Sequence, residues 1–600
     1  MFEAWLQSHS PADYPLKHRL FEKASNRTYW EQYLGDPQIR EAEAYLDYEW
    51  PMIRARHFMA FQTTGNRMVQ EDPHFARRKA LSALFLGELA ECRGRFLPDL
   101  CDGIFAICEE TFWGLSAHYP ITREGDLLPS ASDPYIDLFA AETGELLSVI
   151  YHILYDELWA FCPPILERLE YELERRILTP YCNRGDFWWM GNTPKKPNNW
   201  TPWILQNVLT VFVTVPVSPM RLSFALSKML TEMDRYYQIL PHDGGCDEGA
   251  SYWTKAGAKL FAFCDVLYIT SGGAINLFHE EKLRNVFLFE ARSYIGSCRF
   301  VNFSDGTSLI ANSILEYPLY GAGLRTGEES LCRFAATLKK DQSVFKDTPR
   351  ERNQAGIKEQ LFALIYAEDV DTQLPYVPQD VCILPDLQAA YLRQDSWYCA
   401  IKGGHNAEAH NHNDVGSFIV YYDAEPVLVD PGIGTYTKQT FSPQRYELPG
   451  TQSAYHNLPL INGQQQQNGQ KFRADRFEAE DKTVTVSFAQ AYPESAGVTQ
   501  AVRTLHLKQD GPHISDTFTF PSSAQVTEHF MTPLSVTLSE NAAILGGKYI
   551  LCVEDATVSL DRMDFAGDPK YITAWGCDAL TRIRFTLSGP QARITLRRLP

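Results

Sequence analysis

The chain has 600 residues and a mass of 68.3 kDa, and at about 150 residues per domain this length predicts three or four domains, or fewer if one of them is a large toroid or barrel. Hydrophobic residues make up 45% and charged residues 22%, which is ordinary for a globular protein and excludes a disordered or collagen-like chain. The formal net charge of -19 would repel nucleic acids and anionic membranes, so a polyanionic partner would need a locally basic cleft.

The cysteines and the N-terminus bear on the compartment. The 13 cysteines run from Cys92 to Cys577 without a CxxC pair, which indicates reduced thiols rather than a disulfide framework or a cysteine zinc site. The first residues, MFEAWLQSHSPADYP, lack the basic and apolar regions of a signal peptide. No apolar run approaches the length of a membrane span. We therefore expect a cytoplasmic protein.

The first part of the chain has the apolar spacing of helices. From Met1 to about Asp369, apolar residues recur three and four positions apart, and turn signals separate the runs. This pattern predicts roughly ten to fourteen helices, without the fixed repeat that a regular solenoid would need. The clearest predicted helices are Arg78–Arg93, Tyr135–Trp159, Pro164–Leu178 and Met220–Leu240.

After Cys382 the apolar pattern changes to the alternation that is typical of strands. The polar segment Gln464–Gly469 (QQQQNG) predicts an exposed loop. A helical part followed by a β part predicts an α+β protein with two domains, residues 1–378 and 379–600. The predicted strands are Ala389–Ile401, Ser417–Tyr422, Pro426–Val429, Thr483–Phe488, Thr504–Leu507, His513–Phe520 and Ile594–Leu596.

Histidines and acidic residues gather at the start of the β part. The segment His405–Asp414 reads HNAEAHNHND, and His410 and His412 would share one face of an extended strand. Asp430 follows a predicted strand, and His456 precedes another apolar run. Two imidazoles and one carboxylate on neighbouring strands are suited to hold a divalent metal such as zinc. The alternative is three unrelated loop residues with hydrogen-bond partners, because an H-x-H pattern alone is weak.

The helical part contains a break at Lys195–Trp203, which reads KKPNNWTPW. Two prolines and paired asparagines interrupt the helix pattern, and buried amides at such a break need partners. One interpretation is an Asx turn that caps a helix from Trp203. The other is that an asparagine side chain, with Lys195 and Lys196 beside it, faces a cleft and binds an acidic sugar.

A third segment, His242–Trp253, is the glycine-rich sequence HDGGCDEGASYW. Its glycines predict an irregular loop that brings Glu248 and Tyr252 to the start of the next helix. Such a tyrosine is usually a packing residue, and spacing alone does not distinguish it from a catalytic phenol. The chain lacks GxxxxGK(S/T), HExxH and GxSxG motifs and a GxGxxG after a strand. These absences argue against ATP-dependent, dinucleotide-dependent, zincin and α/β-hydrolase functions.

Together, these three segments resemble the heparinase II/III-like polysaccharide lyases, a family that includes oligoalginate lyases. The most specific part is HNHNDVGSF with VDPGIGTY and SAYHN, which is similar to the family's β-domain signature in order and spacing. NNW and DEGASYW resemble its two active-site loops. The resemblance covers most of the chain. It implies an N-terminal (α/α) toroid, a C-terminal antiparallel β-sandwich, and β-elimination on a glycan that contains uronic acid.

The resemblance also implies roles in that reaction. The C5 proton beside a carboxylate is weakly acidic, so the site must neutralise the carboxylate, remove the proton and protonate the leaving C4 oxygen. By resemblance, Asn199 neutralises the carboxylate, Tyr252 is the acid and also a candidate base, and His410 is a neutraliser or base. Some relatives carry a histidine in the neutralising loop. Asn199 cannot titrate and acts only through hydrogen bonds.

The same resemblance implies that His412, Asp430 and His456 bind one divalent metal, zinc or manganese. Its expected role is structural, because it would hold the His410 strand in place rather than activate water. Glu248 would orient Tyr252 or contact substrate. The expected substrate-binding residues are Asn198, Trp200, Glu248, Tyr436 and Arg445.

The expected partner is an acidic oligo- or polysaccharide, with neither nucleic acid nor membrane. Glycosaminoglycans of the chondroitin, hyaluronan or heparin type come first, and oligoalginate or another bacterial uronate polymer second. No residue decides between them, and oligomeric state stays open. Two other classes remain. A glycoside hydrolase would pair Glu248 with Asp243 or Asp247, and a non-catalytic glycan-binding protein would not need the Tyr252 hydroxyl.

Overall fold

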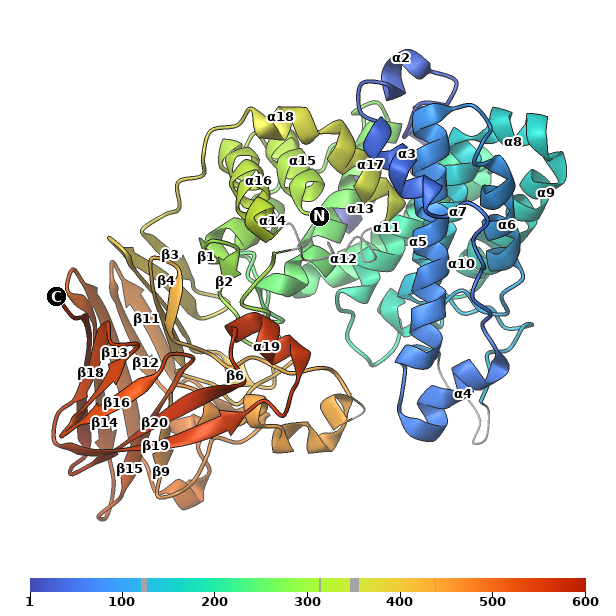
Figure 1. Ribbon diagram of the computed structural model, residues 1–600. Helices are drawn as coiled ribbons and strands as arrows, with labels where there is room; N and C mark the ends of the chain where they lie inside the picture. The colour runs from blue at the N-terminus through green and yellow to red at the C-terminus, as the bar shows by residue number, and fades with distance from the viewer. Residues whose placement is uncertain (120–126, 312–313, 346–355, 438) are drawn as a thin grey trace. The chain divides into compact units, whose positions relative to one another are not determined.

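The computed structural model describes residues 1–119, 127–311, 314–345, 356–437 and 439–600 (Figure 1). The chain divides into two compact units. Two segments from the helical half of the sequence belong with the β part. The helical unit comprises Met1–Leu240, Thr254–Glu281 and Asn312–Tyr376, and the β unit comprises Pro241–Trp253, Lys282–Ala311 and Val377–Pro600.

Before residue 378, the described part of the chain forms 18 α-helices, 13 of them eight residues or longer. They are α1 (Phe2–Ser8), α2 (Arg27–Trp30), α3 (Asp36–Glu43), α4 (Ala55–Thr64), α5 (Met68–Glu91), α6 (Leu97–Cys108), α7 (Leu138–Ile153), α8 (Tyr155–Phe161), α9 (Pro163–Leu173), α10 (Thr179–Asn183), α11 (Trp200–Thr214), α12 (Pro219–Ile239), α13 (Gly257–Thr270), α14 (Glu281–Ser293), α15 (Glu316–Thr326), α16 (Glu329–Gln342), α17 (Ile357–Ile365) and α18 (Ala367–Asp371).

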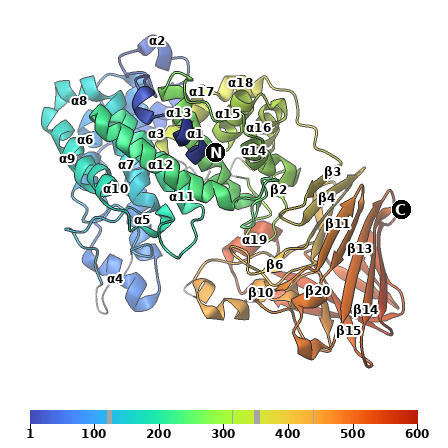
Figure 2. The same ribbon diagram turned by 180° about the vertical axis from the view of Figure 1, so that it is seen from behind.

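The helical unit is built around a closed ring of five helices. Helix α7 packs against α11, α11 against α13, α13 against α15 and α15 against α17, and α17 returns to α7. Helices α9, α12 and α16 pack outside this ring against α7, α11 and α15. This two-layered ring is the expected (α/α) toroid (Figures 1 and 2).

The sequence determines which helices form the inner layer. Helix α11 is apolar on nearly all sides and is buried along its length, whereas the outer helix α12 buries one face only. The ring interior also holds buried charges. Lys358 Nζ lies 3.3 Å from Glu145 Oε2 and donates to Thr210 Oγ1 at 2.9 Å. These contacts join α17 to α7 and α11.

The β unit contains antiparallel sheets, in which some neighbouring strands follow each other in sequence and others are far apart. Its elements are β1 (Tyr294–Gly296), β2 (Arg299–Phe300), β3 (Val381–Leu384), β4 (Ala389–Gln394), β5 (Trp397–Lys402), β6 (His405–Asn406), β7 (Phe418–Tyr422), β8 (Glu425–Leu428), β9 (Pro459–Ile461), β10 (Gly469–Arg473), β11 (Arg476–Glu480), β12 (Thr483–Ser487), β13 (Gln500–Lys508), β14 (Gly511–Thr519), β15 (Val526–Thr532), β16 (Val536–Ser539), β17 (Ala542–Leu545), β18 (Tyr549–Val553), β19 (Ala556–Asp564), α19 (Pro569–Trp575), β20 (Ala579–Leu587) and β21 (Gln591–Arg598).

Three sheets share one hydrophobic core. Their strand orders are β3-β4-β5-β7-β8, β11-β12-β13-β14-β21-β18-β17-β16 and β19-β20-β15-β9. The core contains Cys399 and Phe418 from the first sheet, Leu505 and Ile594 from the second, and Phe530 from the third, all essentially inaccessible to solvent. Along β13 and β14 buried and exposed residues alternate, as expected for sheets with one face in the core of a β-sandwich.

Three sequence predictions need correction in detail. Ala389–Ile401 is a hairpin and not one strand, because the chain turns between Gln394 and Trp397, with Asp395 at φ 53°. The long predicted helix Tyr135–Trp159 breaks at Leu154 into α7 and α8. The Gln464–Gly469 segment is not wholly exposed, since Gln466 is 3% exposed and hydrogen-bonds to both backbone polar groups of Val415.

The described residues also bear on the cysteines and on membrane-spanning helices. All thirteen cysteines are free thiols there. None of the helices in the described ranges combines the length and the apolar character that a membrane span requires.

Candidate active site

Tyr252 lies on the loop Pro241–Trp253 of the β unit, and glycines shape this loop. Gly249 adopts φ 100°, and a Cβ there would lie 2.6 Å from the carbonyl oxygen of Phe303, so only glycine fits. The following 3-10 turn presents Tyr252, and Trp253 anchors it by donating from Nε1 to the Val286 oxygen at 2.7 Å. Tyr252 is 9% exposed.

Asp305 is at the centre of the site. Its carboxylate is 1% exposed and accepts hydrogen bonds from four side chains. On Oδ2 it accepts from His410 Nδ1 at 2.7 Å and from Tyr436 OH at 2.8 Å. On Oδ1 it accepts from His412 Nε2 at 2.9 Å and from Arg445 Nη2 at 2.6 Å. Four residues predicted for the site therefore share one carboxylate. They are the predicted catalytic His410, the predicted metal ligand His412, and the predicted substrate-binding residues Tyr436 and Arg445.

The charge of Asp305 fixes the direction of these hydrogen bonds. Burial alone would raise the pKa of Asp305, but the bonds from His410 and His412 and the charge of Arg445 outweigh it and hold the pKa well below its usual value. An ionised carboxylate only accepts hydrogen bonds. The single hydroxyl proton of Tyr436 therefore points to Asp305, and its oxygen is left to accept.

Tyr252 must consequently donate to Tyr436. The two hydroxyl oxygens lie 2.5 Å apart, and because the Tyr436 proton is committed to Asp305, the Tyr252 proton lies between the phenols. Burial, followed by the charge of Asp305, raises the pKa of Tyr252 far above its usual value. Tyr252 is thus a neutral phenol at physiological pH and can give up a proton.

His410 faces the same cluster from the segment that follows β6. Its backbone has φ 55°, a left-handed conformation that is uncommon outside glycine and is concentrated at functional sites. Nδ1–H donates to Asp305, so Nε2 keeps its lone pair in the neutral ring. That nitrogen lies 3.7 Å from Glu248 Oε2. The His410 ring centre is 4.5 Å from that of Tyr252.

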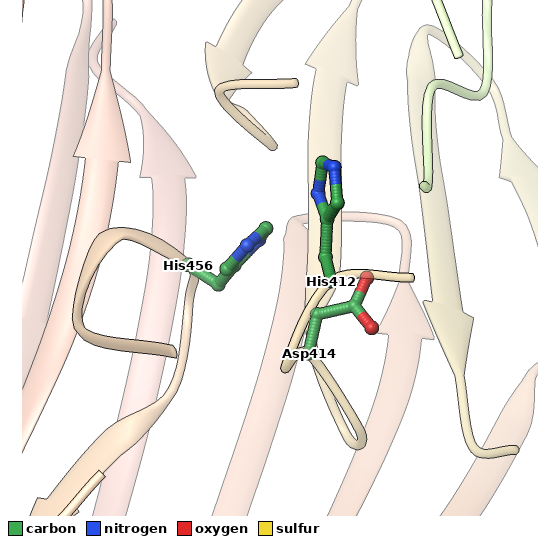
Figure 3. Close-up of side chains that lie close together, drawn as sticks. All are labelled: His412, Asp414 and His456. Carbon is green, nitrogen blue, oxygen red and sulfur yellow. The ribbon is translucent and has the colours of Figure 1, made fainter. Parts of the chain in front are cut away.

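A second cluster, His412, Asp414 and His456, is fully buried, and its potential ligand atoms lie within 4.8 Å of one another (Figure 3). His412 and Asp414 share one loop, and His456 comes from another. Because His412 donates from Nε2 to Asp305, its Nδ1 carries a lone pair. No hydrogen-bond partner for this buried Nδ1 exists among the described residues. An orphaned, buried imidazole lone pair of this kind fits a metal ligand.

In His456, as in His412, Nδ1 is the ring nitrogen that is available to a metal. Its Nε2 lies 3.0 Å from the Gly450 carbonyl oxygen, which can only accept, so Nε2 carries a proton. Its Nδ1 lies 2.9 Å from Asp430 Oδ2. A carboxylate oxygen and a ring nitrogen that face each other require a proton or a metal between them or beside them. The predicted ligands His412, Asp430 and His456 therefore fit a divalent cation in their donor chemistry.

Asp414 was not predicted, although it belongs to the buried cluster. Lys402 binds its Oδ1 at 2.8 Å and also binds Glu408 Oε2 at 2.9 Å. Asp414 Oδ2 has no hydrogen-bond partner among the described residues. Asp414 is thus the carboxylate that the structure gathers with the two histidines, whereas Asp430 is hydrogen-bonded to His456 Nδ1. Asp430 stays a ligand prediction from the resemblance.

A buried arginine fastens the two histidine-bearing loops. Arg503 is inaccessible to solvent and pairs with Asp516 at 2.6 Å. Its Nη1 also donates to the backbone oxygens of Gly416 and Asn457, at 2.9 and 2.7 Å. These residues follow the His412 and His456 loops directly. The geometry of the cluster is therefore built into the sandwich core.

The Asn199 loop belongs to the helical unit. Helix α11 begins at Trp200, earlier than predicted, and the Asn198 side chain makes the Asx turn by accepting from Trp200 N at 3.0 Å. Asn199 is 6% exposed. Trp200 packs on His118, with ring centres 4.8 Å apart. Lys195 lies over the ring of Trp188. The loop thus contains both the Asx turn at Asn198 and a partly exposed aromatic ring, that of Trp200.

Arg445 is turned into the protein. Besides Asp305, its guanidinium donates to the backbone oxygens of His410 at 2.9 Å and Asn411 at 3.1 Å. It is 8% exposed. These bonds favour a role in holding the His410 segment over direct contact with substrate. Tyr436, by contrast, is half-buried, and its hydroxyl contacts that of Tyr252.

Sequence reasoning missed Asp305, Asp414 and Lys402. Asp305 lies in the segment FVNFSDGTS, in the helical half of the sequence. This segment contains no recognisable motif. The one available signal was the Ser-Asp-Gly turn, with Ser304 at φ 60° in the structure.

Known proteins resemble this chain in part of its sequence and in its fold. Residues 384–570 match the family described as "Heparinase II/III-like, C-terminal", which confirms the resemblance over this part of the chain. No curated protein matches the sequence.

Solved structures extend the likeness to both units. A heparinase III gene product is similar with a TM-score of 0.63 at 11% identity, over 94% of this chain and 84% of that one. Another heparinase III gives 0.62 at 13% identity, over 94% and 85%. A mutant of the heparan sulfate lyase HepC from Pedobacter heparinus gives 0.58 at 12% identity, over 100% and 87%. At these identities the likeness establishes the fold, the predicted toroid followed by a β-sandwich.

Proposed function

We propose that this protein is a polysaccharide lyase that cleaves uronic-acid-containing glycans by β-elimination and leaves unsaturated uronate ends. The observation that carries the proposal is the chain of hydrogen bonds from Tyr252 through Tyr436 to Asp305, with His410 on the same carboxylate. It pairs a neutral phenolic acid with an imidazole that keeps one free lone pair, and β-elimination needs such an acid and such a base.

In the proposed reaction His410 Nε2 removes the C5 proton of the uronate. Asp305 holds the ring through Nδ1–H and stabilises the imidazolium that forms, as does Glu248 beside Nε2. Tyr252 gives its proton to the departing C4 oxygen, and Tyr436 then turns its hydroxyl proton from Asp305 to the phenolate oxygen that is left. The electron pair of the C5–H bond becomes the C4–C5 double bond as the C4–O bond breaks.

Asn199 is proposed to neutralise the substrate carboxylate. Its amide donates hydrogen bonds and cannot take the C5 proton, so proton transfer falls to His410 and Tyr252. As charge moves from C5 into the carboxylate group, the amide bond to that group strengthens. Trp200 and Asn198 would shape the same subsite, and a neighbouring aromatic face suits the apolar side of a sugar ring.

The metal of the proposed site is zinc, held by His412, Asp430 and His456. When bound, it supplies a positive charge that ties two loops together. His412 and His456 each have Nε2 committed to a protein acceptor, so both offer Nδ1. None of these residues reaches toward the substrate, because all three are fully buried. The proposed role of the metal is therefore structural.

Glycosaminoglycans are the proposed substrates, with heparan sulfate first among them. One similar fold is that of a heparan sulfate lyase, and Lys195 and Lys196 beside the Asn199 loop are exposed cations that suit an acidic chain. Hyaluronan and chondroitin are the next candidates. Oligoalginate is the alternative outside this class.

A glycoside hydrolase is less well supported by the carboxylates. It would need a second free carboxylate with Glu248. Asp243 accepts from three backbone amides, those of Gly245, Asp386 and Leu387. Asp247 accepts from the Ala409 amide at 3.1 Å. Both carboxylates are used to shape loops.

The test is an ultraviolet absorbance assay for unsaturated uronate with the full-length, zinc-loaded protein. The panel contains heparan sulfate, heparin, chondroitin sulfates, hyaluronan and alginate oligomers. A rise in absorbance on a glycosaminoglycan that is absent with Tyr252→Phe supports the proposal. Chain cleavage without that absorbance would indicate hydrolysis. No cleavage of any member by a folded, metal-loaded protein would contradict the proposed substrate class.

A further inference from the structure

The loop Val301–Ser308, which follows β2, contacts the Tyr252 loop and the segments that carry His410, Asp430 and Tyr436. Ser304 Oγ donates to the Asp247 oxygen at 2.8 Å, and Thr307 N donates to Ser251 Oγ at 3.0 Å. These bonds hold the loop that carries Tyr252. Asn302 Nδ2 donates to the Asp430 oxygen at 2.9 Å. The loop thus lies between the tyrosine segment and the metal ligands.

Within this loop, Asp305 is used completely by the protein. A carboxylate has about four lone-pair positions, and those of Asp305 meet four donors, two on each oxygen. With 1% exposure it has no surface left for a substrate. Asp305 therefore does not take part in the reaction directly and acts through the groups that it holds.

The division of donors between the two oxygens is informative. Oδ2 holds His410 and Tyr436, which lead to the reacting groups. Oδ1 holds His412, which leads to the metal cluster, and Arg445. One rigid group thereby sets both the orientation of the catalytic pair and the tautomer of a metal ligand.

We propose that Asp305 is the positioning residue that couples metal binding to the alignment of Tyr252 and His410. Its bond to His412 Nε2–H leaves Nδ1 as the ligand atom, and a bound metal in turn fixes that ring and the carboxylate that also holds Tyr436 and His410. The metal half of this inference is independent of the proposed function. The catalytic half rests on it.

The main variant is Asp305→Asn in the full-length protein. The amide has nearly the same shape, but its NH2 group must face two donors, so one pair of bonds is replaced by repulsion. We expect the affinity for Zn²⁺, measured by competition with a chelator, to fall about 10- to 100-fold, the usual effect of removing such a partner of a metal-bound histidine. We expect kcat to fall with KM little changed, because Asp305 does not contact substrate.

The matched control is Asp265→Asn in the helical unit. Asp265 is also a fully buried carboxylate that accepts from a tyrosine and an arginine, Tyr317 OH at 3.0 Å and Arg325 Nε at 2.6 Å. The Asp265→Asn substitution removes a similar charge from a similar environment and does not touch the metal cluster. Its Zn²⁺ affinity should equal that of the wild type. Equal losses in both variants would mean general destabilisation and would overturn the proposal.

A measurement on the wild type keeps the proposal testable if Asp305→Asn does not fold. Histidine-selective NMR of the zinc-loaded protein should show His412 protonated at Nε2 and metal-bound at Nδ1. The opposite tautomer would overturn the inference. Unchanged Zn²⁺ affinity in a folded Asp305→Asn protein would overturn its metal half. A lowered affinity in a protein that cleaves none of the glycans would uphold that half and refute the proposed function instead.

Discussion

At Tyr252 the hydrogen-bond chain determines both the position of the proton and its availability. The Tyr436 hydroxyl is committed to Asp305, so the Tyr252 proton is held between the two phenols. The raised pKa of Tyr252 keeps it neutral. A residue in this state serves as an acid and would be inert as a base until it loses its proton.

Tyr252→Phe removes that proton while it keeps the ring in place. We expect turnover on a cleaved glycan to fall about 10²- to 10⁴-fold, the usual contribution of a general acid, with unchanged zinc content. Steady-state kinetics measure the effect. Tyr492→Phe is the control, because it removes a buried hydroxyl that donates to the Pro459 oxygen in the same unit. A Tyr252→Phe protein that is as active as this control would exclude the acid role.

The sequence predicted the site residues that lie in motifs and missed those that act through tertiary contacts. His410, His412 and Tyr252 stand in segments rich in chemically active residues. The structure bonds both histidines to one carboxylate, and Tyr252 reaches that carboxylate through Tyr436. Asp305 itself is a single acid in an ordinary turn. Its importance arises only when three segments far apart in sequence converge. Nor could a sequence tell that Arg445 points inward, because arginines bind substrates and backbones equally well.

At the scale of elements, periodicity predicted strands at β4, β5, β7, β8, β12, β13, β14 and β21, missed the other strands of the β unit and failed at turns. Ala389–Ile401 was predicted as one strand, but the polar run Arg393–Ser396 interrupts it, and Asp395 adopts a left-handed conformation there and reverses the chain, which aspartate tolerates. The error on Gln466 has a similar origin. A polar run predicts exposure on average, whereas one amide that satisfies a buried backbone is invisible in the pattern.

Gln466→Ala tests the buried amide. The Gln466 side chain accepts from Val415 N and from Asn406 Nδ2, and donates to the Val415 oxygen at 2.7 Å. Its loss would leave these groups unpaired, at about 1–3 kcal/mol each before relaxation. We expect the free energy of unfolding of the β unit to fall by about 3 kcal/mol, measured with urea. Gln467→Ala, at an exposed neighbour, should change it little, and equal effects would refute the interpretation.

Strand β15 gives the β unit a specific sensitivity to acid. Burial, followed by the charges of Arg582 and Arg584, lowers the pKa of His529 to about 3, well below the ordinary value of 6.5. The depressed pKa means that the unfolded chain binds a proton first as the pH falls. The stability due to neutral His529 is complete above pH 6.5 and is lost between there and pH 3.

His529→Gln should remove this part of the acid response. Between pH 6.5 and 4.5 the wild type should lose about 2 kcal/mol more of its unfolding free energy than the variant does. Urea denaturation at the two pH values measures the difference, and comparison of the variant with the wild type cancels the contributions of other groups. Parallel loss in both proteins would show that His529 is not the sensor.

For the whole molecule, the units interleave along the chain in a way that periodicity cannot reveal. The change from helical to strand pattern near residue 380 is correct as local structure. The β unit nevertheless includes Pro241–Trp253 and Lys282–Ala311, and these segments carry Tyr252 and Asp305. A fragment that begins at residue 379 would hold the metal ligands without the carboxylate that orients His412.

Because the metal ligands belong to one unit, metal should stabilise that unit selectively. Binding to the folded state alone adds about 2.7 kcal/mol at a free Zn²⁺ concentration 100 times Kd. In scanning calorimetry we expect chelation to lower the unfolding temperature of one transition and leave another in place. His412→Ala should bind less than stoichiometric zinc and lose the chelator response. His513→Ala, which removes a partly exposed histidine paired with Asp510 in the same unit, should keep both. If His412→Ala retains stoichiometric zinc, the ligands are not those proposed, and the coupling through Asp305 fails with them.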